Sequence, residues 1–481
     1  MYEYLIEGGF PIKGTITASG NKNAALPCIA ATLLTAESVI LHNIPEIEDT
    51  SVMLNILQSF GVKATNIKKH SWKIEAKNVK ASCIPAELSK KIRASILFAG
   101  PLLARCGKAE MLPPGGDVIG RRRVDTHFLA LTQLGARIDV NGQFTFTANK
   151  LVGTDIFLDE ASVTATENAI MAAVLAEGKT TITNAACEPH IQDLCNMLNL
   201  MGAKITGIGS NILYIEGVEK LHGCEFTIGP DYMEIGSFIG LAAATKGSIT
   251  IEGIKPEDMR PLKIGFNKLG ISWTINGTTL SVSSVQEMKT NADIGSKIPK
   301  IDDSPWPGFP PDLTSIMTVV ATQVEGTVLI FEKMFESRMF FVDKLLNMDM
   351  SIDKKGNLPE ILIYHTHSQE GYLKSGNYSE GNTVMEVGDY LEQILEEKYG
   401  FNVLHHKGKY DVNDRDHAYS NAEPGLRKVL QDNPSIQVVI DLHRDGVSEN
   451  THLVTEVNGK KTAQIMFFNG LSRTTSQGNI A

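Results

Sequence analysis

The chain has 481 residues, of which 42% are hydrophobic and 21% charged, and its formal net charge is -10. This composition excludes a disordered, a collagenous and a disulfide-stapled protein. The acidic balance also excludes the broad basic surface of a protein that binds nucleic acid or an anionic membrane. The six cysteines form no Cys-x-x-Cys pair, and the N-terminus has no export signal. We therefore expect a cytoplasmic protein without a membrane segment.

The first 350 residues repeat one pattern, an apolar helix followed by a glycine turn and a strand. The pattern recurs in residues 23–43, 92–112, 167–185, 234–253 and 312–332. An amphipathic helix that ends near a glycine and leads into a strand alternates with it, in residues 54–65, 129–140, 198–206 and 265–275. A period of about 70 residues fits a β/α subdomain copied five times. Because the first helix type is apolar all round, we expect these helices to be buried.

Two positions near the apolar helices are candidate anion contacts. Lys22 and Asn23 stand just before the first helix, where unpaired N–H groups and the helix dipole favour an anion. The alternative is a surface lysine beside a capping asparagine. Arg93 opens the second apolar helix, where it either binds an anion or forms an ordinary surface pair.

The segment 112–128 joins a Pro-Pro-Gly-Gly turn to Asp117 and the three arginines Arg121–Arg123. The planar guanidinium of Arg122 can grip a phosphate or a carboxylate through two hydrogen bonds. Asp117 is then a carboxyl group on a loop beside the bound anion. The alternative is a solvated patch of charge.

Asp312 begins the fifth apolar helix after a proline-rich stretch. It is either a helix-start carboxylate, which is common, or a general base held on a rigid element. Arg338 follows as a further candidate anion contact.

Taken in order, these phrases resemble one family. SGNKNAALP, IRASI, PGGDVIGRRRVDTH, ASVTATENAIM, FPPDLTS and FESR resemble the UDP-N-acetylglucosamine enolpyruvyl transferases (1-carboxyvinyltransferases) over about residues 1–350. The resemblance implies an α/β fold, namely an inside-out α/β barrel. Members of the family have six β/α subdomains arranged in two lobes, and we expect five of these subdomains in this chain. It implies a complete lobe over residues 22–229 and an incomplete lobe from residues 1–21 and 230–350. Residues 351–359 read as a linker.

The resemblance also implies a reaction, the transfer of the enolpyruvyl group from phosphoenolpyruvate to the 3-hydroxyl of UDP-N-acetylglucosamine, with release of phosphate and no cofactor. This is the first committed step of peptidoglycan synthesis. Lys22 and Arg122 would hold phosphoenolpyruvate, and Asp312 would take the hydroxyl proton. Asp117 stands where most members carry cysteine; we expect it to act as the acid and the enzyme to resist epoxide drugs that alkylate the thiol.

The resemblance also implies the family's remaining site positions. Glu188 and Asp231 would give polar support near the cleft. The residues expected to bind the two substrates are Lys22, Asn23, Arg93, Arg122, Arg123, Val124, Asp125, Thr126, Ser162, Val163, Asp312, Met334 and Arg338.

The back part, residues 360–481, holds most of the histidines and a different pattern. Apolar strands in residues 356–372, 401–406 and 435–446 alternate with helices in residues 382–400 and 422–430, which predicts a parallel sheet. Residues 452–470 predict a hairpin around Asn458-Gly459.

His367 and His443 follow two of these strands, and Glu386 lies at the start of the intervening helix. Two histidines and a carboxylate can form a catalytic zinc site, with His365 as an alternative first ligand. The other interpretation is strand-end histidines satisfied by hydrogen bonds.

IYHTHSQEGY, MEVGDYL and IDLHRDG resemble the stage II sporulation protein P family, zinc-dependent N-acetylmuramoyl-L-alanine amidases, over the first two-thirds of their catalytic domain. We therefore expect a truncated α/β amidase-like domain after the transferase part. The leading hypothesis is the transferase. An inactive fusion and a zinc amidase are the alternatives.

Overall fold

The computed structural model describes residues 5–116, 123–295, 297–335, 338–342, 345, 358–370, 383–412, 417–436 and 438–442, and the backbone of residues 454–457 and 460–463. The chain forms two compact units, Met1–Met348 and Asp349–Ala481. Among the described helices, none combines the length and the apolar character that a bilayer span requires.

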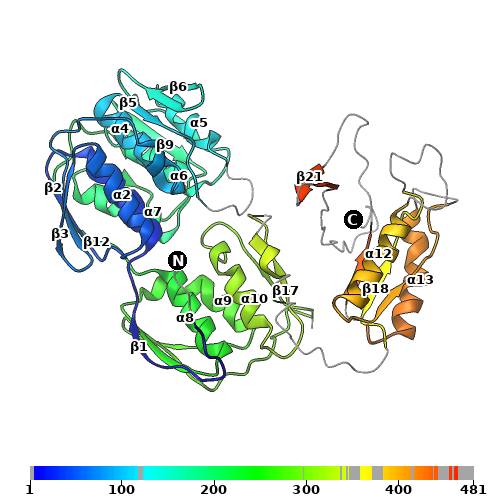
Figure 1. The fold of residues 1–481 in the computed structure, drawn as a ribbon. Coiled ribbons are helices and arrows are strands. Elements are labelled where there is room, and N and C mark those ends of the chain that lie inside the picture. The colour runs from blue at the N-terminus through cyan, green and yellow to red at the C-terminus, as the bar shows by residue number, and fades with distance from the viewer. Residues whose placement is uncertain are drawn as a thin grey trace. The chain divides into compact units, whose positions relative to one another are not determined.

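The first unit contains two separate hydrophobic cores, one in each of the two groups of helices and strands that Figure 1 shows for this unit. One core draws on residues 24–228, and the other on Ala18 and residues 232–320. We call these parts the first lobe (residues 22–229) and the second lobe (residues 5–21 and 230–342). The chain passes between the lobes beside Asn21, whose N–H donates to Gly229 O at 2.8 Å.

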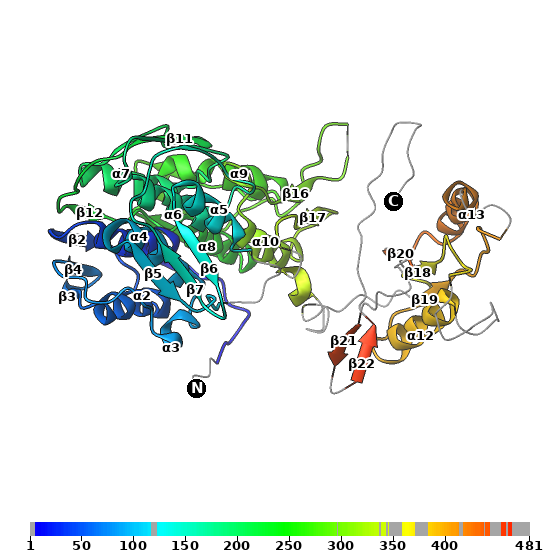
Figure 2. The same cartoon turned by 90° about the horizontal axis from the view of Figure 1, so that it is seen from above.

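Three sheets surround the core of the first lobe. The strands of the first sheet have the spatial order β12 (Glu225–Thr227), β2 (Ser38–His42), β4 (Ser71–Glu75) and β3 (Lys63–Lys68). The second sheet has the order β5 (Lys108–Met111), β7 (Phe144–Thr147) and β6 (Arg137–Val140). The third sheet has the order β10 (Lys204–Thr206), β11 (Ile212–Glu216), β9 (Lys179–Thr183) and β8 (Asp155–Phe157). Figure 2 shows β5, β6 and β7 together beside α4. Each sheet is built around the strands of one copy of the repeat that the sequence predicts, and β12 joins the first sheet from the far end of the lobe.

The helices of the first lobe are of the two predicted kinds. The buried kind comprises α1 (Lys22–Ala31) continued by η1 (Thr32–Leu34), η2 (Arg93–Phe98) continued by α4 (Ala99–Cys106), and α6 (Val163–Ala173). The amphipathic kind comprises α2 (Glu48–Ser59), α5 (Asp125–Gln133) and α7 (Pro189–Leu200), and a short α3 (Ala86–Ser89) lies between β4 and η2. Residues 24–31 of α1 are all buried, which confirms that apolar residues all round a helix indicate burial.

The second lobe is built from the same kinds of sheet and helix as the first, but its described residues contain two sheets in place of three. Its larger sheet has the order β1 (Lys13–Thr17), β13 (Ser248–Glu252), β15 (Thr279–Val282) and β14 (Thr274–Asn276). Its smaller sheet has only β16 (Lys300–Asp302) and β17 (Leu329–Phe331) within the described residues. The helices are α8 (Tyr232–Ala244), α9 (Met259–Lys268) and α10 (Thr314–Ala321), with short turns η3 (Pro256–Asp258), η4 (Pro311–Leu313) and η5 (Arg338–Phe341).

Within the described residues, helices α8 and α10 are less well covered than their counterparts in the first lobe. In the first lobe, three helices of the buried kind pack together, whereas in the described part of the second lobe only two do. Leu241 of α8 is therefore 45% exposed and Val319 of α10 is 40% exposed. Such half-covered apolar faces stabilise a helix less than full burial does.

We expect the amide hydrogens of α8 and α10 to exchange at least about tenfold faster than those of α1 and α6, because local stability follows buried apolar contact. Hydrogen exchange followed by mass spectrometry on the full chain measures this difference. Equal protection of the four helices would contradict the prediction and show that the α8/α10 face is covered in solution.

The second unit contains the predicted parallel sheet, in the order β19 (Val403–His405), β18 (Ile361–Tyr364) and β20 (Val438–Asp441). Helices α12 (Val384–Glu397) and α13 (Ala418–Asp432) flank it (Figure 2). Strands β21 (Val454–Val457) and β22 (Lys460–Ala463) pair antiparallel, which confirms the predicted hairpin.

Candidate active site

A cavity of about 590 Å³ in the first unit is lined by residues of both lobes. Its wall includes many of the residues that the sequence singles out. These are Lys22, Asn23, Arg93, Arg123, Ser162, Val163, Glu188, Asp312, Met334 and Arg338. The fold therefore brings together positions that are more than 300 residues apart in the sequence.

Lys22 reaches this cavity from the start of α1, where two helices begin side by side. Asp231 caps α8 by accepting from Met233 N at 2.9 Å, and its other oxygen accepts from Lys22 N at 3.4 Å. The expected capping asparagine is not Asn23. Helix α1 begins at Lys22, and Asn21 caps it through Ala24 N, so Asn23 lies inside the helix and faces the cavity. Burial raises the pKa of Asp231, although the N–H donors oppose the shift.

Arg93 lies at the start of η2, a 3-10 turn, instead of the predicted regular helix. Its guanidinium donates to Arg123 O at 2.6 Å, which ties η2 to the start of α5. Arg123 in turn pairs with Asp159 at 3.2 Å and with Asp125. These contacts bring two guanidinium groups to one side of the cavity.

Val124, Asp125 and Thr126 lie next to this arginine but are not among the residues that line the cavity. Thr126 is buried and donates to Asp159 Oδ1 at 2.8 Å, so it fixes the start of α5. Their predicted role in substrate binding stays a prediction. The predicted residues Asp117 and Arg122 lie outside the described residues, and Gly116 just before them lines the cavity.

Asp312 comes from the second lobe, in the turn η4 just before α10. Its carboxylate is 46% exposed and pairs with Arg338 Nη2 at 2.8 Å. Arg338 also lies over the ring of Phe335, with 5.0 Å between its guanidinium carbon and the ring centroid. Its Nε lies 3.8 Å from Glu332 Oε2. The carboxylate and the guanidinium therefore face the same space as one oriented pair.

Other residues line the cavity without having been predicted for it. Glu167 and His190 reach it from α6 and α7, and the rings of Tyr232 and Trp306 lie 5.3 Å apart at its edge. Burial raises the pKa of Glu188 and of Glu167, the latter well above its usual value. Burial lowers the pKa of His190 to about 4, although the charge of Asp312 opposes the shift. No local pattern in the sequence indicates Glu167 or His190 as site residues, because both lie in helices that meet only through packing.

In the second unit, the predicted histidines His365 and His367 follow strand β18. Register pairs Tyr364 of β18 with Asp441 of β20, and Asp441 accepts from Thr366 N at 3.0 Å and from Thr366 Oγ1 at 2.5 Å. His365 and His367 flank this threonine. His443 lies outside the described residues.

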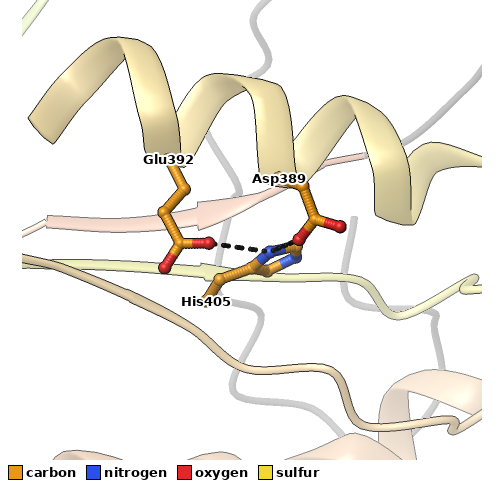
Figure 3. Close-up of side chains that lie close together, drawn as sticks. All are labelled: Asp389, Glu392 and His405. Carbon is orange, nitrogen blue, oxygen red and sulfur yellow. Dashed lines mark hydrogen bonds and ion pairs between the residues drawn. The ribbon is translucent and has the colours of Figure 1, made fainter. Parts of the chain in front are cut away.

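Glu386 forms a capping box with Thr383 at the start of α12, and its Oε2 accepts from Thr383 N at 2.7 Å. A second cluster of ligand-type side chains lies nearby, formed by Asp389, Glu392 and His405 (Figure 3). His405 Nδ1 lies 2.9 Å from Asp389 Oδ1 and 3.5 Å from Glu392 Oε2.

The contacts around this second cluster show a hydrogen-bonded chain that holds α12 to β19. Lys407 pairs with Asp389 at 2.5 Å, and this hydrogen bond lowers the pKa of the Asp389 carboxyl. His405 Nε2 lies 2.8 Å from His365 Nε2, and His365 Nδ1 lies 3.0 Å from Leu442 O. Because Lys407 already neutralises Asp389, we interpret the cluster as structural.

Comparison with known proteins gives two matches to family models. The family described as EPSP synthase (3-phosphoshikimate 1-carboxyvinyltransferase) matches residues 6–376. The family described as stage II sporulation protein P (SpoIIP) matches residues 318–481. The two matches overlap at the junction and confirm the predicted resemblances.

Curated relatives and solved structures agree with the first match. A UDP-N-acetylglucosamine 1-carboxyvinyltransferase of Treponema denticola is 68% identical over 352 residues, which cover 73% of this chain and 83% of the relative. A protein of the same name from Bacteroides fragilis is 42% identical over 436 residues, covering 89% of this chain and 98% of the relative.

The crystal structure of the enolpyruvyl transferase NikO from Streptomyces tendae superposes with a TM-score of 0.60 at 18% identity, covering 90% of this chain and 96% of that one. At that identity the likeness shows the fold alone. Together with the relatives, it confirms the predicted enolpyruvyl transferase fold. The chain therefore belongs to the enolpyruvyl transferase family, among the UDP-N-acetylglucosamine 1-carboxyvinyltransferases.

Proposed function

We propose that this chain transfers the enolpyruvyl group of phosphoenolpyruvate to the 3-hydroxyl of UDP-N-acetylglucosamine and releases phosphate. The observation that carries the proposal is the cavity between the two hydrophobic cores, where Lys22, Arg93 and Arg338 bring cationic groups to the same space as the carboxylate of Asp312. The curated relatives bear the name of this activity.

The reaction requires a base, an acid and a cationic clamp. The sugar hydroxyl oxygen bonds to the central carbon of phosphoenolpyruvate while its proton goes to Asp312, and a proton adds to the methylene carbon. The bond from carbon to phosphate oxygen then breaks and a methyl proton leaves, which restores the double bond. Lys22 and Arg122 would hold the phosphate and carboxylate charges, because fixed cations stabilise an anion that grows as phosphate leaves. The Arg338 pair holds the Asp312 carboxylate in one orientation.

Phosphate release tests this proposal. We expect release only when phosphoenolpyruvate and UDP-N-acetylglucosamine are both present. A chain that binds the sugar nucleotide but releases no phosphate would instead be a non-catalytic fusion, and the proposed activity would be wrong.

We assign Asp117 as the acid that protonates the methylene carbon. The assignment rests on the residue type, because a carboxyl group can donate a proton and stands where most members of the family carry cysteine. Because a carboxylate is a weaker nucleophile towards an epoxide than a thiolate, we expect fosfomycin to cause no time-dependent inactivation. The Asp117→Cys variant is expected to keep activity and to lose it progressively with fosfomycin. Equal inactivation of both proteins, measured as residual activity after preincubation, would contradict this role.

A second function is favoured by the SpoIIP match and by the paired ends of β18 and β20. We propose that His367, Glu386 and His443 hold one zinc ion. The parallel register fits this set, because it brings the carboxyl end of β18, which His367 follows in the sequence, beside the carboxyl end of β20, which His443 follows in the sequence. Both ring nitrogens of His365 contact other groups, which favours His367 as the first ligand. Bound zinc would supply Lewis acidity for hydrolysis of an N-acetylmuramoyl-L-alanine amide.

Metal analysis of the full chain tests this site. We expect about one zinc per chain, and its loss in the His443→Ala variant, because two remaining ligands bind zinc weakly. The His405→Ala variant is the control, since His405 belongs to the structural cluster, and it is expected to keep the zinc. Zinc retained by His443→Ala and lost from His405→Ala would contradict the assigned ligands.

A further inference from the structure

The innermost wall of the cavity carries polar atoms that nothing in the described protein satisfies. Both ring nitrogens of His190, one oxygen of Glu167 and one oxygen of Glu188 are buried there and have no hydrogen-bond partner among the described residues. A buried polar group left without a partner has lost its hydrogen bonds to water and gained none in return, which destabilises the fold. Several such atoms on one wall therefore indicate a surface built to meet a polar ligand.

His190 is the most informative of these residues. It is the second residue of α7 and only 4% exposed. His190 and Asp312 line the same cavity although they come from different lobes. With a pKa lowered by burial to about 4, the imidazole is neutral at pH 7 and has one donor and one acceptor.

Another buried histidine shows that this fold ordinarily satisfies such a ring. His127 is fully buried, yet its Nε2 lies 3.0 Å from Thr164 Oγ1 and its Nδ1 lies 2.9 Å from Asn168 Nδ2. The two unused nitrogens of His190 are thus particular to the cavity wall and do not reflect a general feature of buried histidines in this lobe.

The chemistry of the wall selects the kind of ligand group that it meets. A neutral imidazole with one donor and one acceptor matches a hydroxyl or an amide, which also offers both. The pyrophosphate and carboxylate groups of the substrates are better matched by Lys22, Arg93 and Arg123, which line the same cavity.

We propose that His190 binds the sugar ring of the acceptor, through a hydroxyl or the acetamido group next to the reacting hydroxyl, and so determines specificity for the sugar. This inference rests on the proposed function, because it takes Asp312 as the base that faces the 3-hydroxyl. Glu188, at the N-cap position of the same helix, and Glu167 complete the wall.

Calorimetric titration of the full chain with UDP-N-acetylglucosamine and with UDP tests the proposal. We expect His190→Ala to weaken binding of the sugar nucleotide about tenfold, as expected for the loss of buried hydrogen bonds, and to leave binding of UDP unchanged. His190→Gln keeps a donor and an acceptor and is expected to recover most of the affinity. His42→Gln is the control, because both nitrogens of His42 already contact Ser71 and Glu225 away from the cavity.

The outcomes separate this inference from the proposed function. If the wild type binds the sugar nucleotide but releases no phosphate from phosphoenolpyruvate, the proposed activity fails while the His190 result still decides the inference. Equal weakening for UDP and for the sugar nucleotide, or no weakening in His190→Ala, would overturn the role of His190. A wild type that binds no sugar nucleotide would overturn both. Should His190→Ala fail to fold, the His190→Leu variant, which fills the space but has neither a donor nor an acceptor, gives the same comparison once thermal melting shows that it folds.

Discussion

Replacing Asp312 by asparagine is expected to lower kcat for phosphate release by about 10²- to 10⁴-fold, the usual contribution of a positioned general base. The amide keeps the size of the side chain but cannot take the hydroxyl proton. Because the carboxylate is 46% exposed, loss of its pair with Arg338 is expected to cost at most about 1 kcal/mol of stability. Steady-state kinetics and thermal melting measure the two effects.

Glu257→Gln is a matched control for this substitution. Glu257 is an exposed carboxylate in η3 of the same lobe and does not line the cavity. We expect its kcat to remain within about twofold of the wild-type value, as for most exposed surface substitutions. A kcat for Asp312→Asn equally close to wild type would show that another group is the base.

Replacing Phe98 by alanine is expected to reduce the free energy of unfolding of the first lobe by about 3–5 kcal/mol. Phe98 is completely buried at the end of η2 and packs edge-on against Phe60, with ring centroids 5.6 Å apart. Arg93 lies in the same turn η2. Because a cavity at Phe98 would make this turn less rigid, Arg93 would be held less firmly in the site, and the KM for the substrates is expected to rise. Chemical unfolding followed by fluorescence or circular dichroism measures the stability change.

Phe157→Ala provides the comparison in the same lobe. Phe157 lies in β8 and is 64% exposed, so its removal is expected to cost less than about 1 kcal/mol. Similar losses for Phe98 and Phe157 would contradict the account in which the buried helices form the core that positions the site.

Much of the first unit could be predicted from hydrophobic pattern alone. The all-round apolar sequence of α1 predicts a buried helix, and α1 is buried. The same pattern in α8 predicts equal burial, yet Leu241 is half exposed because a helix pattern cannot show whether a third neighbour exists. Lys22 and Asp312 could be singled out because each stands at a helix start, where the backbone favours a charged ligand or carboxylate.

The remainder of the site depends on packing that the sequence does not reveal. Glu167 lies in the middle of α6 and His190 in the first turn of α7, and both line the cavity only because these helices pack next to the second lobe. In the second unit, the pairing of His405 with Asp389 joins β19 to α12 and likewise has no local signature. Local pattern therefore predicted the frame of both units better than it predicted their polar contacts.

The transfer itself is the central claim, and the mass of the sugar nucleotide after incubation with phosphoenolpyruvate tests it most directly. We predict that mass spectrometry will detect UDP-N-acetylglucosamine carrying an enolpyruvyl ether, in amounts equal to the phosphate released. Phosphate without a modified sugar nucleotide, or an unchanged mixture, would contradict the claim that these two lobes join both substrates in one cavity.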